Sequence, residues 1–188
     1  MPPALKLVTS SAPRSASLEA FADALSTLAS GVVLVTCWVG DRPWGMTATA
    51  FASVSAKPPM VLVSLGSQTA TARAITATRT FGVSILAADQ IDLARYGSAP
   101  GAAKFLEPFT EAREAPGASP SIAGALAHLD CEVSEEVHIA DHTVFFGRVL
   151  AARASHTGAP LVYQRRAYAT LADSAAEHPS TGSTSAAA

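Results

Sequence analysis

The sequence predicts a mainly β protein, folded as an antiparallel β-barrel with a few peripheral helices. Three observations lead to this prediction. Most apolar residues fall in β-branched or alternating runs rather than at helical spacing. Short turn sequences separate successive runs, and such turns join antiparallel neighbours, whereas parallel strands need long crossovers. Closing these strands into a barrel would remove the exposed edges of the sheet.

The first third of the chain is expected to form one helix followed by three strands. Leu18, Phe21, Leu25 and Leu28 recur at intervals of three and four residues, with Ser17 before them as a candidate N-cap. Strands are predicted at residues 32–39, 45–55 and 60–65, separated by turns that contain Gly, Asp and Pro. This succession predicts an antiparallel meander.

The rest of the chain is expected to combine short helices, a long loop and further strands. Helices are predicted at residues 70–78 and at 89–96, where Gly97 would end the second, and a strand at 81–86. The proline-containing stretch that follows is predicted to be loop around a small helical piece at 102–106. The remaining β-rich runs predict a hairpin and a last strand pair, at 125–138 with 143–153 and at 161–163 with 167–171.

Length and composition indicate a single domain and restrict the class of partner. The 188 residues predict one domain over 16–172, flanked by flexible tails at 1–15 and 173–188. A net charge of −2 and the absence of Lys/Arg runs argue against nucleic acid. The longest apolar stretches fall far short of the roughly 20 residues of a membrane span, and the N-terminus does not resemble a secretory signal. We therefore expect a cytoplasmic protein that binds no membrane.

Several well-known motifs are missing from the sequence. No G-x-G-x-x-G occurs, and the first strands lack the helical crossover of a dinucleotide-binding domain. Gly40 and Gly45 have the spacing of a P-loop, but Met46 stands where the Lys is required. There is no G-x-S-x-G and no H-E-x-x-H, and His138 and His142 lie in strand and turn sequence rather than on one helix face. We expect no bound metal, and we expect Cys37 and Cys131 to be small buried hydrophobes.

Residues 64–73 are predicted to bind an anion. They run from the end of a strand through Gly66 into the start of a helix, where free backbone N–H groups point outward. Several hydroxyls and Arg73 lie in the same stretch, and such groups hold a phosphate by hydrogen bonds. Ordinary capping of the helix by Ser67 or Thr69 is the alternative interpretation.

The strand predicted at residues 45–55 has one face rich in hydroxyls. Thr47, Thr49, Ser53 and Ser55 share this face, while small apolar residues occupy the other. Such polarity would be costly in an apolar core. The face therefore either contacts solvent or forms the wall of a site for a planar ligand that makes many hydrogen bonds.

An ordered set of segments resembles the flavin reductase-like family, and in particular the small reductase components of two-component flavin-dependent monooxygenases. The resemblance covers roughly residues 18–171, and the order of the segments carries it rather than any one of them. The matching segments are residues 29–36, 45–55 with Pro58 and Pro59, 61–65, 81–86, Lys104 with Phe105, 141–149 and 160–163.

The resemblance implies a specific fold and activity. The fold would be an FMN-binding split barrel, usually a homodimer. The protein would bind FMN or FAD and reduce it with NADH or NADPH. The reduced flavin would then reach a separate oxygenase component by diffusion. Hydride transfer between two stacked rings needs no acid–base pair, which fits the lack of a catalytic carboxylate pair in the sequence.

The resemblance also implies roles for individual residues. Positions expected along the isoalloxazine and ribityl chain are Met46, Thr47, Ala48, Thr49, Ala50 and Ser53. Positions expected to hold the phosphate are Ser64, Leu65, Gly66, Ser67 and Thr71. Lys104 and Phe105 would lie near the phosphate or the nicotinamide, and His142, Arg165 and Tyr168 would hold the nicotinamide nucleotide. His142 is the candidate catalytic residue, as a proton or ribose contact, with a surface turn histidine as the alternative.

Three positions depart from the pattern of the family. Ser84 stands where the family often has Asn and is expected to contact the flavin or the backbone nearby. The family commonly has a Gly between an Arg and the final aromatic residue, whereas this chain has Arg165-Arg166-Ala167-Tyr168, and Trp44 beside the flavin loop is unusual. Two alternatives stay open: a non-catalytic flavin-binding or sensing module, and a flavin-dependent oxidase of a small substrate on the same barrel.

Overall fold

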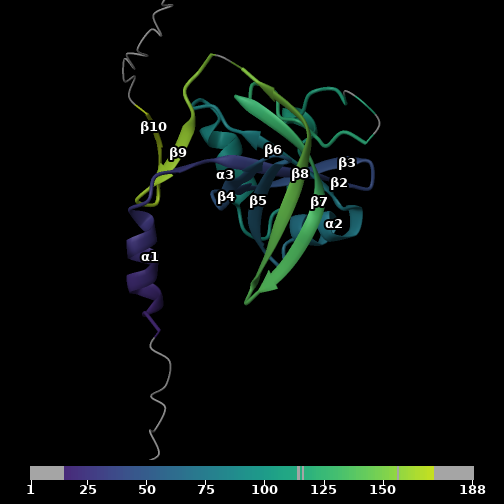
Figure 1. Cartoon of the computed structure of the whole chain (residues 1–188). Helices are drawn as coiled ribbons and strands as arrows, with labels where there is room; N and C mark the ends of the chain where they lie inside the picture. Colours follow the sequence, from purple (N-terminus) through teal and green to yellow (C-terminus); the bar gives the residue numbers. More distant parts are fainter. Residues whose placement is uncertain (1–14, 114, 116, 156, 172–188) are drawn as a thin grey trace, which may run out of the picture.

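The computed structural model describes residues 15–113, 115, 117–155 and 157–171 (Figure 1). The two predicted tails therefore lie almost wholly outside the described residues. Within the described part, no helix has the length and hydropathy that crossing a bilayer requires.

Seven strands form one antiparallel sheet in the order β3-β2-β6-β7-β8-β5-β4. The mainly β, antiparallel fold predicted from the sequence is thus confirmed. Their bounds are β2 Val33–Val39, β3 Arg42–Ala48, β4 Phe51–Ala56, β5 Pro59–Gly66, β6 Thr80–Ile85, β7 Ala127–Ile139 and β8 His142–Ala154.

The sheet curls because its two edge strands are neighbours in the chain. β3 and β4 lie at opposite ends of the strand order, yet only Thr49 and Ala50 connect them. Three Cα-to-Cα steps span at most about 11 Å, so the sheet must bend until its edges approach each other. A hydrogen bond of 3.0 Å from the Ser64 amide to the Ala50 carbonyl holds this connection against β5.

The predicted continuous strand over residues 45–55, and with it the simple meander, is wrong. The strand breaks at Thr49 and Ala50, and the register of β4 against β5 shifts between Ser53 and Ser55. Val54, which the alternation places on the apolar face, is 46% exposed. The apolar and polar residues keep alternating through a corner of the barrel, so the sequence pattern does not show that the backbone bends there.

A smaller sheet and helix α1 lie beside the barrel. The sheet has the order β1-β9-β10, with β1 Ser30–Gly31, β9 Leu161–Gln164 and β10 Ala167–Thr170, which confirms the predicted last strand pair. The predicted first helix is confirmed as α1 (Leu18–Ser26), where Ser17 caps the amide of Ala20. Figure 1 shows α1 projecting away from the barrel, and none of its residues is buried.

The other helices lie close to their predicted places, with two differences. α2 spans Ala70–Thr78 as expected, whereas α3 (Ile91–Ser98) continues through Gly97, the predicted end. Gly97 is needed inside α3 because a Cβ there would meet Thr47 of β3 and come within 2.7 Å of Leu34 Cδ1. The helical piece predicted at 102–106 is wrong, since Phe105 pairs with Trp44 as extended backbone and a 3-10 helix, η1, follows at Glu107–Phe109.

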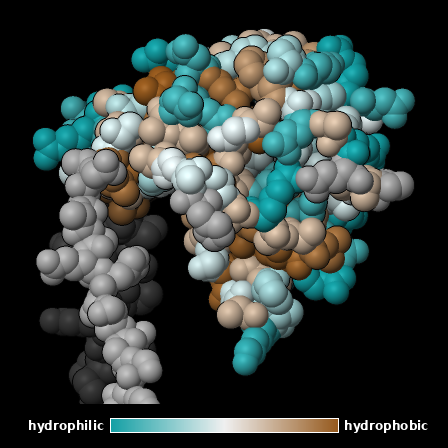
Figure 2. Space-filling model, turned by 90° about the horizontal axis from the view of Figure 1, so that it is seen from above, coloured by the Kyte–Doolittle hydropathy of each residue, from teal (hydrophilic) through white to brown (hydrophobic). Residues whose placement is uncertain are grey.

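Two hydrophobic clusters share strand β2 as a common wall. Val33, Val35 and Cys37 face the barrel interior, while Leu34 faces the cluster under α3. Strand β2 is therefore buried on both faces over most of its length, which explains its mostly apolar sequence, in which Thr36 is the one polar residue. Cys37 and Cys131 are 1% and 2% exposed, so their predicted place in the core is confirmed. Seen from above, the surface carries several separate hydrophobic clusters among hydrophilic residues (Figure 2).

Candidate functional site

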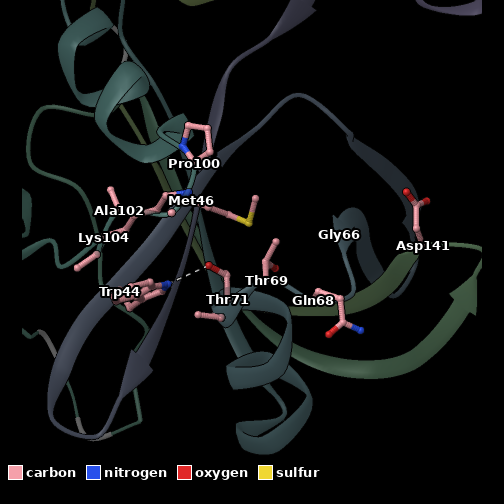
Figure 3. A pocket seen from close by; sticks show the side chains of 13 residues that line it. Trp44, Met46, Gly66, Gln68, Thr69, Thr71, Pro100, Ala102, Lys104 and Asp141 are labelled. Carbon is pink, nitrogen blue, oxygen red and sulfur yellow. Dashed lines mark hydrogen bonds between the residues drawn. The ribbon is translucent and has the colours of Figure 1, made fainter. Parts of the chain in front are cut away.

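Two cavities adjoin strand β3. The first, of about 750 Å³, lies between β3, the start of α2 and the loop at residues 100–104 (Figure 3). The second, of about 630 Å³, lies between β3, α3 and the β9–β10 hairpin. Met46 lines the first cavity and its neighbour Thr47 lines the second. The volumes of both fall within the usual range for small-molecule sites, about 300–1,000 Å³.

The first cavity contains backbone donors at the start of α2. Thr69 is the N-cap, and its hydroxyl accepts a hydrogen bond of 3.1 Å from the amide of Ala72. The Thr69 carbonyl accepts the amide of Arg73 at 3.2 Å. Within the described residues, the amides of Ala70 and Thr71 have no acceptor. Two free N–H groups at a helix N-terminus form a site for an anion.

Trp44 and Thr71 connect two walls of the first cavity. The indole Nε1 of Trp44 donates to the Thr71 hydroxyl at 3.1 Å, drawn as a dashed line in Figure 3. Thr71 is only 1% exposed. The Trp44 ring meets the ring of Phe105 edge-on at 4.9 Å, and the Arg42 guanidinium lies 3.4 Å from the Phe105 centroid. The aromatic contacts thus fix the indole against the loop that closes the cavity.

The cavity also has one cationic and one anionic side chain. Lys104 lines it from the loop, and partial burial lowers the pKa of its ammonium group. Asp141 lines the rim, and its hydrogen bond with His142 lowers the pKa of the carboxyl. Lys104 and the start of α2 therefore line the same cavity, while the exposed Asp141 stands in the turn between β7 and β8.

The second cavity combines aromatic rings with guanidinium groups. Tyr163 and Tyr168 line it with their ring centroids 5.2 Å apart. Arg95 and Arg166 also line it, and each is paired with an exposed acidic residue. A cavity of this kind suits a ligand with both planar rings and phosphates.

The structure brings about half of the predicted site residues to the two cavities. The first is lined by Met46, Gly66, Thr71 and Lys104. The second is lined by Thr47, Ala48, Thr49 and Tyr168. Ala50 lies next to these, in an apolar groove formed by α1, β1 and β4.

Other predicted residues line neither of the two cavities. Leu65 is buried in the barrel core, and the Ser67 hydroxyl is bonded to Thr143 at 2.8 Å. Phe105 acts through its contact with Trp44. Ser64 and Ser53 line neither cavity, and Ser53 is exposed on β4. Ser64 and Leu65 lie within β5, and alternate side chains of a strand point to opposite faces, so consecutive residues cannot all face one cavity.

Three further predicted residues line neither cavity. Ser84 is fully buried, and its hydroxyl lies 2.9 Å from His128 Nδ1 and accepts the backbone amide of Ile122 at 3.3 Å, so of the two predicted contacts the structure shows the one with the backbone. Arg165 lies in the β9–β10 turn with its amide bonded to Ser26, and Arg166 lines the second cavity instead. His142 is half-exposed and reaches the first cavity through Asp141, whose Oδ1 lies 2.8 Å from its Nδ1.

Sequence reasoning missed several cavity residues. Gln68 and residues 100–103 line the first cavity, and Arg95 lines the second. Arg165 and Arg166 both have positive φ, 48° and 62°, and such a tight turn determines which guanidinium faces inward. No local pattern predicts that choice. The described residues also contain no cluster of three His, Cys, Asp or Glu side chains suited to a metal ion.

Comparison with known proteins identifies the family. The model of the flavin reductase like domain matches residues 25–172. The reductase component of a Rhodococcus opacus 4-nitrophenol 4-monooxygenase/4-nitrocatechol 2-monooxygenase is 38% identical over 145 residues, 77% of this chain and 76% of that protein. A Streptomyces globisporus NADH-dependent FAD reductase is 41% identical over 127 residues, 65% of this chain and 69% of that protein.

A solved structure agrees with these relatives. It is a Streptomyces globisporus NADH:FAD oxidoreductase in complex with NAD and FAD fragments. It superposes with a TM-score of 0.76 at 32% identity, covering 82% of this chain and 93% of that one. The fold and the sequence therefore lead to the same conclusion: this chain belongs to the flavin reductase-like domain family.

Proposed function

We propose that the chain is an NAD(P)H-dependent flavin reductase that reduces FMN or FAD and supplies free reduced flavin to a partner monooxygenase. The observation that carries the proposal is the pair of neighbouring cavities on β3, one of which has free helix amides and a lysine. Membership of the family and the names of the relatives support it. A cytoplasmic location is part of the proposal.

The residues of the first cavity fit a flavin phosphate. The amides of Ala70 and Thr71, the Thr71 hydroxyl and the Lys104 ammonium together offer hydrogen bonds and positive charge. The flavin ring and ribityl chain would lie against Met46 of β3, at the boundary with the second cavity, which Thr47, Ala48 and Thr49 line. The chemistry of the donors therefore matches the ligand at its charged end.

The second cavity fits a nicotinamide nucleotide. Arg95 and Arg166 can pair with its phosphates, and Tyr163 and Tyr168 can pack against a planar ring. When both nucleotides are bound, a hydride passes from the nicotinamide C4 to the flavin N5, giving oxidised nicotinamide and reduced flavin. The chain's task is to align the two rings, and we assign His142 a contact at the cavity rim rather than an acid–base step.

Exposed lining residues support exchange of the flavin with solvent. Gln68, Ala70, Pro100 and Asp141 are all exposed at the first cavity. A ligand bound behind such a rim can dissociate without the opening of a lid. Delivery of reduced flavin to a separate oxygenase requires such dissociation.

The activity is tested by mixing the protein anaerobically with NADH or NADPH and with FMN or FAD. We expect rapid, catalytic bleaching of the flavin absorbance with at least one pair. Bleaching would also identify the preferred cofactors. Flavin binding without bleaching for any pair would contradict the proposal and favour a sensing module, whereas bleaching by a small amine would favour an oxidase.

We also propose that two copies of the chain form a homodimer through α1 and the adjoining groove. Leu18, Phe21 and Leu25 of α1 are 82%, 54% and 55% exposed, which is unusual for the apolar stripe of an amphipathic helix. An apolar groove of about 550 Å³ lies next to it, lined by Phe51 and Leu62 among others. The apolar stripe of α1 and the groove belong to the same chain. In a two-fold symmetric dimer, both surfaces can therefore be buried in the contact with the second chain.

Light scattering after gel filtration tests the dimer. Wild type should have twice the chain mass of 19.2 kDa. Leu25→Glu should give a monomer because it places a charge in the buried stripe. Ala20→Glu adds the same charge on another side of α1 and should leave the dimer intact. A monomeric wild type would contradict the proposal.

A further inference from the structure

The hydroxyl hydrogen of Thr71 has no acceptor within the described residues. Indole Nε1 is a donor only, so in its contact with Trp44 the Thr71 oxygen must accept. A threonine in a helix can donate to the carbonyl three or four residues earlier, as Thr78 does to Ala74, but Thr71 in the first turn of α2 forms no such bond. Thr71 lines the first cavity, so its O–H group is a donor that remains free for a ligand.

Trp44 is held in place from several sides. Its backbone pairs with Cys37 of β2 on one side and with Phe105 of the loop on the other. Its ring packs edge-on against Phe105, which in turn lies under Arg42, and Arg42 forms an ion pair of 2.6 Å with Glu107. Gly45 follows it, where a Cβ would come within 2.7 Å of the Val35 carbonyl. The indole N–H therefore has a fixed direction toward Thr71.

We propose that Trp44 is a positioning residue for recognition of the flavin phosphate, acting through Thr71. The indole N–H occupies an acceptor site of the Thr71 oxygen and so orients the hydroxyl hydrogen toward the cavity. There it joins the free amides of Ala70 and Thr71 as a third donor to the phosphate. A donor that is already oriented loses less entropy when the anion binds. This inference rests on the proposed function.

The test compares FMN with riboflavin, which has the same ring and ribityl chain but no phosphate. Equilibrium dissociation constants are measured by flavin fluorescence without any nicotinamide nucleotide. Trp44→Phe keeps an aromatic ring against Phe105 and removes the N–H. We expect it to raise the dissociation constant of FMN about three- to tenfold, while that of riboflavin changes less than about twofold.

A double-mutant cycle tests whether Trp44 acts through Thr71. Thr71→Val removes the hydroxyl at nearly constant shape and should itself weaken FMN selectively. In that background Trp44→Phe should have less than about a twofold further effect, since the bond it breaks no longer exists. Trp38→Phe is the matched control, because Trp38 also donates its N–H, to the Ala118 carbonyl at 2.8 Å, but lines neither cavity. It should leave both dissociation constants unchanged.

Three results would overturn the inference. Equal weakening of FMN and riboflavin by Trp44→Phe would indicate ring packing instead. A full additive loss in the double variant would show that Trp44 acts independently of Thr71. Equal dissociation constants of FMN and riboflavin in the wild type would contradict the phosphate site itself. Flavin binding is measured without turnover, so the two proposals fail separately. A protein that prefers FMN but oxidises no NAD(P)H would contradict the reductase proposal, and the binding test of Trp44 and Thr71 would still be valid.

If Trp44→Phe does not fold, Thr71→Val examines the same hydrogen bond from its other partner. Loss of the acceptor should shift the Trp44 fluorescence emission and reduce the preference for FMN together. An unchanged emission in a folded Thr71→Val variant would contradict the contact.

Discussion

Ser84 and His128 form a buried pair on neighbouring strands. They are partners in the register of β6 and β7, and the Ser84 hydroxyl lies 2.9 Å from His128 Nδ1. The other ring nitrogen of His128 lies 3.1 Å from the Ser119 hydroxyl, which also bonds to Asp130 at 2.5 Å. The amide of Ile122 donates to Ser84 at 3.3 Å. This network ties the loop before β7 to the barrel.

Ser84→Ala should therefore destabilise the fold and leave flavin binding unchanged. The variant deprives buried polar groups of His128 and Ile122 of a partner, which costs about 1–3 kcal/mol. Urea denaturation measures the stability and a flavin titration measures the binding. Ser134→Ala is the control, because Ser134 makes one hydrogen bond but is exposed. Weaker flavin binding at unchanged stability would restore the flavin contact that the sequence suggested.

Gly147→Ala should lower stability through a clash in the barrel core. A Cβ at Gly147 would lie 2.5 Å and 2.8 Å from ring atoms of Phe81, which is fully buried. Overpacking of this kind costs about 1–3 kcal/mol, visible as a lower melting temperature. Gly31→Ala is the matched control, since nothing lies within 4 Å of its added Cβ. Equal melting temperatures for the two variants would contradict the packing described.

The preference for FMN over riboflavin should fall at alkaline pH because of Lys104. Partial burial lowers the pKa of its ammonium group, so it loses its proton at a lower pH than an ordinary lysine. A bound phosphate favours the protonated form, and binding therefore weakens as the pH rises through this pKa. The ratio of the two dissociation constants cancels the ionisation of the flavin ring, which both ligands share.

Lys104→Met should abolish this pH dependence and reduce the FMN preference at neutral pH by about two- to fivefold, the effect of a largely exposed charge pair. Lys57→Met removes an exposed lysine outside both cavities and should change neither quantity. If the preference for FMN falls equally with rising pH in wild type and in Lys104→Met, a group other than Lys104 titrates.

Cys37 and Cys131 should resist thiol reagents in the folded protein. Burial raises the pKa of each thiol to about 12, and both side chains are almost fully shielded. Titration with a chromogenic disulfide should detect neither thiol under native conditions and both after denaturation. Ser134→Cys places a thiol at an exposed position and should react at once. Rapid reaction of the wild type would show that the barrel core opens.

Features encoded by short stretches of sequence were predictable. α2 begins and ends where its pattern indicates, because Thr69 caps it locally and Arg79 ends it in a left-handed conformation. The hairpin of β7 and β8 and the pair of β9 and β10 likewise depend on strands with short turns between them. The proposal of a phosphate site at the start of α2 follows from the same local chemistry.

Features that depend on residues far apart in the sequence were not predictable from the sequence. The side chains of Trp44 and Thr71 meet across 27 positions of sequence, and Ser84 meets His128 across 44. The positive-φ turn between β9 and β10 decides whether Arg165 or Arg166 lines the second cavity. Closure of the seven-stranded sheet decides where the chain bends at Thr49. The residues alone thus specified the family, the antiparallel strands and a helix start suited to phosphate. Which hydroxyls and guanidinium groups face the cavities depended on register and twist, because a shift of one residue along a strand reverses the direction of every side chain.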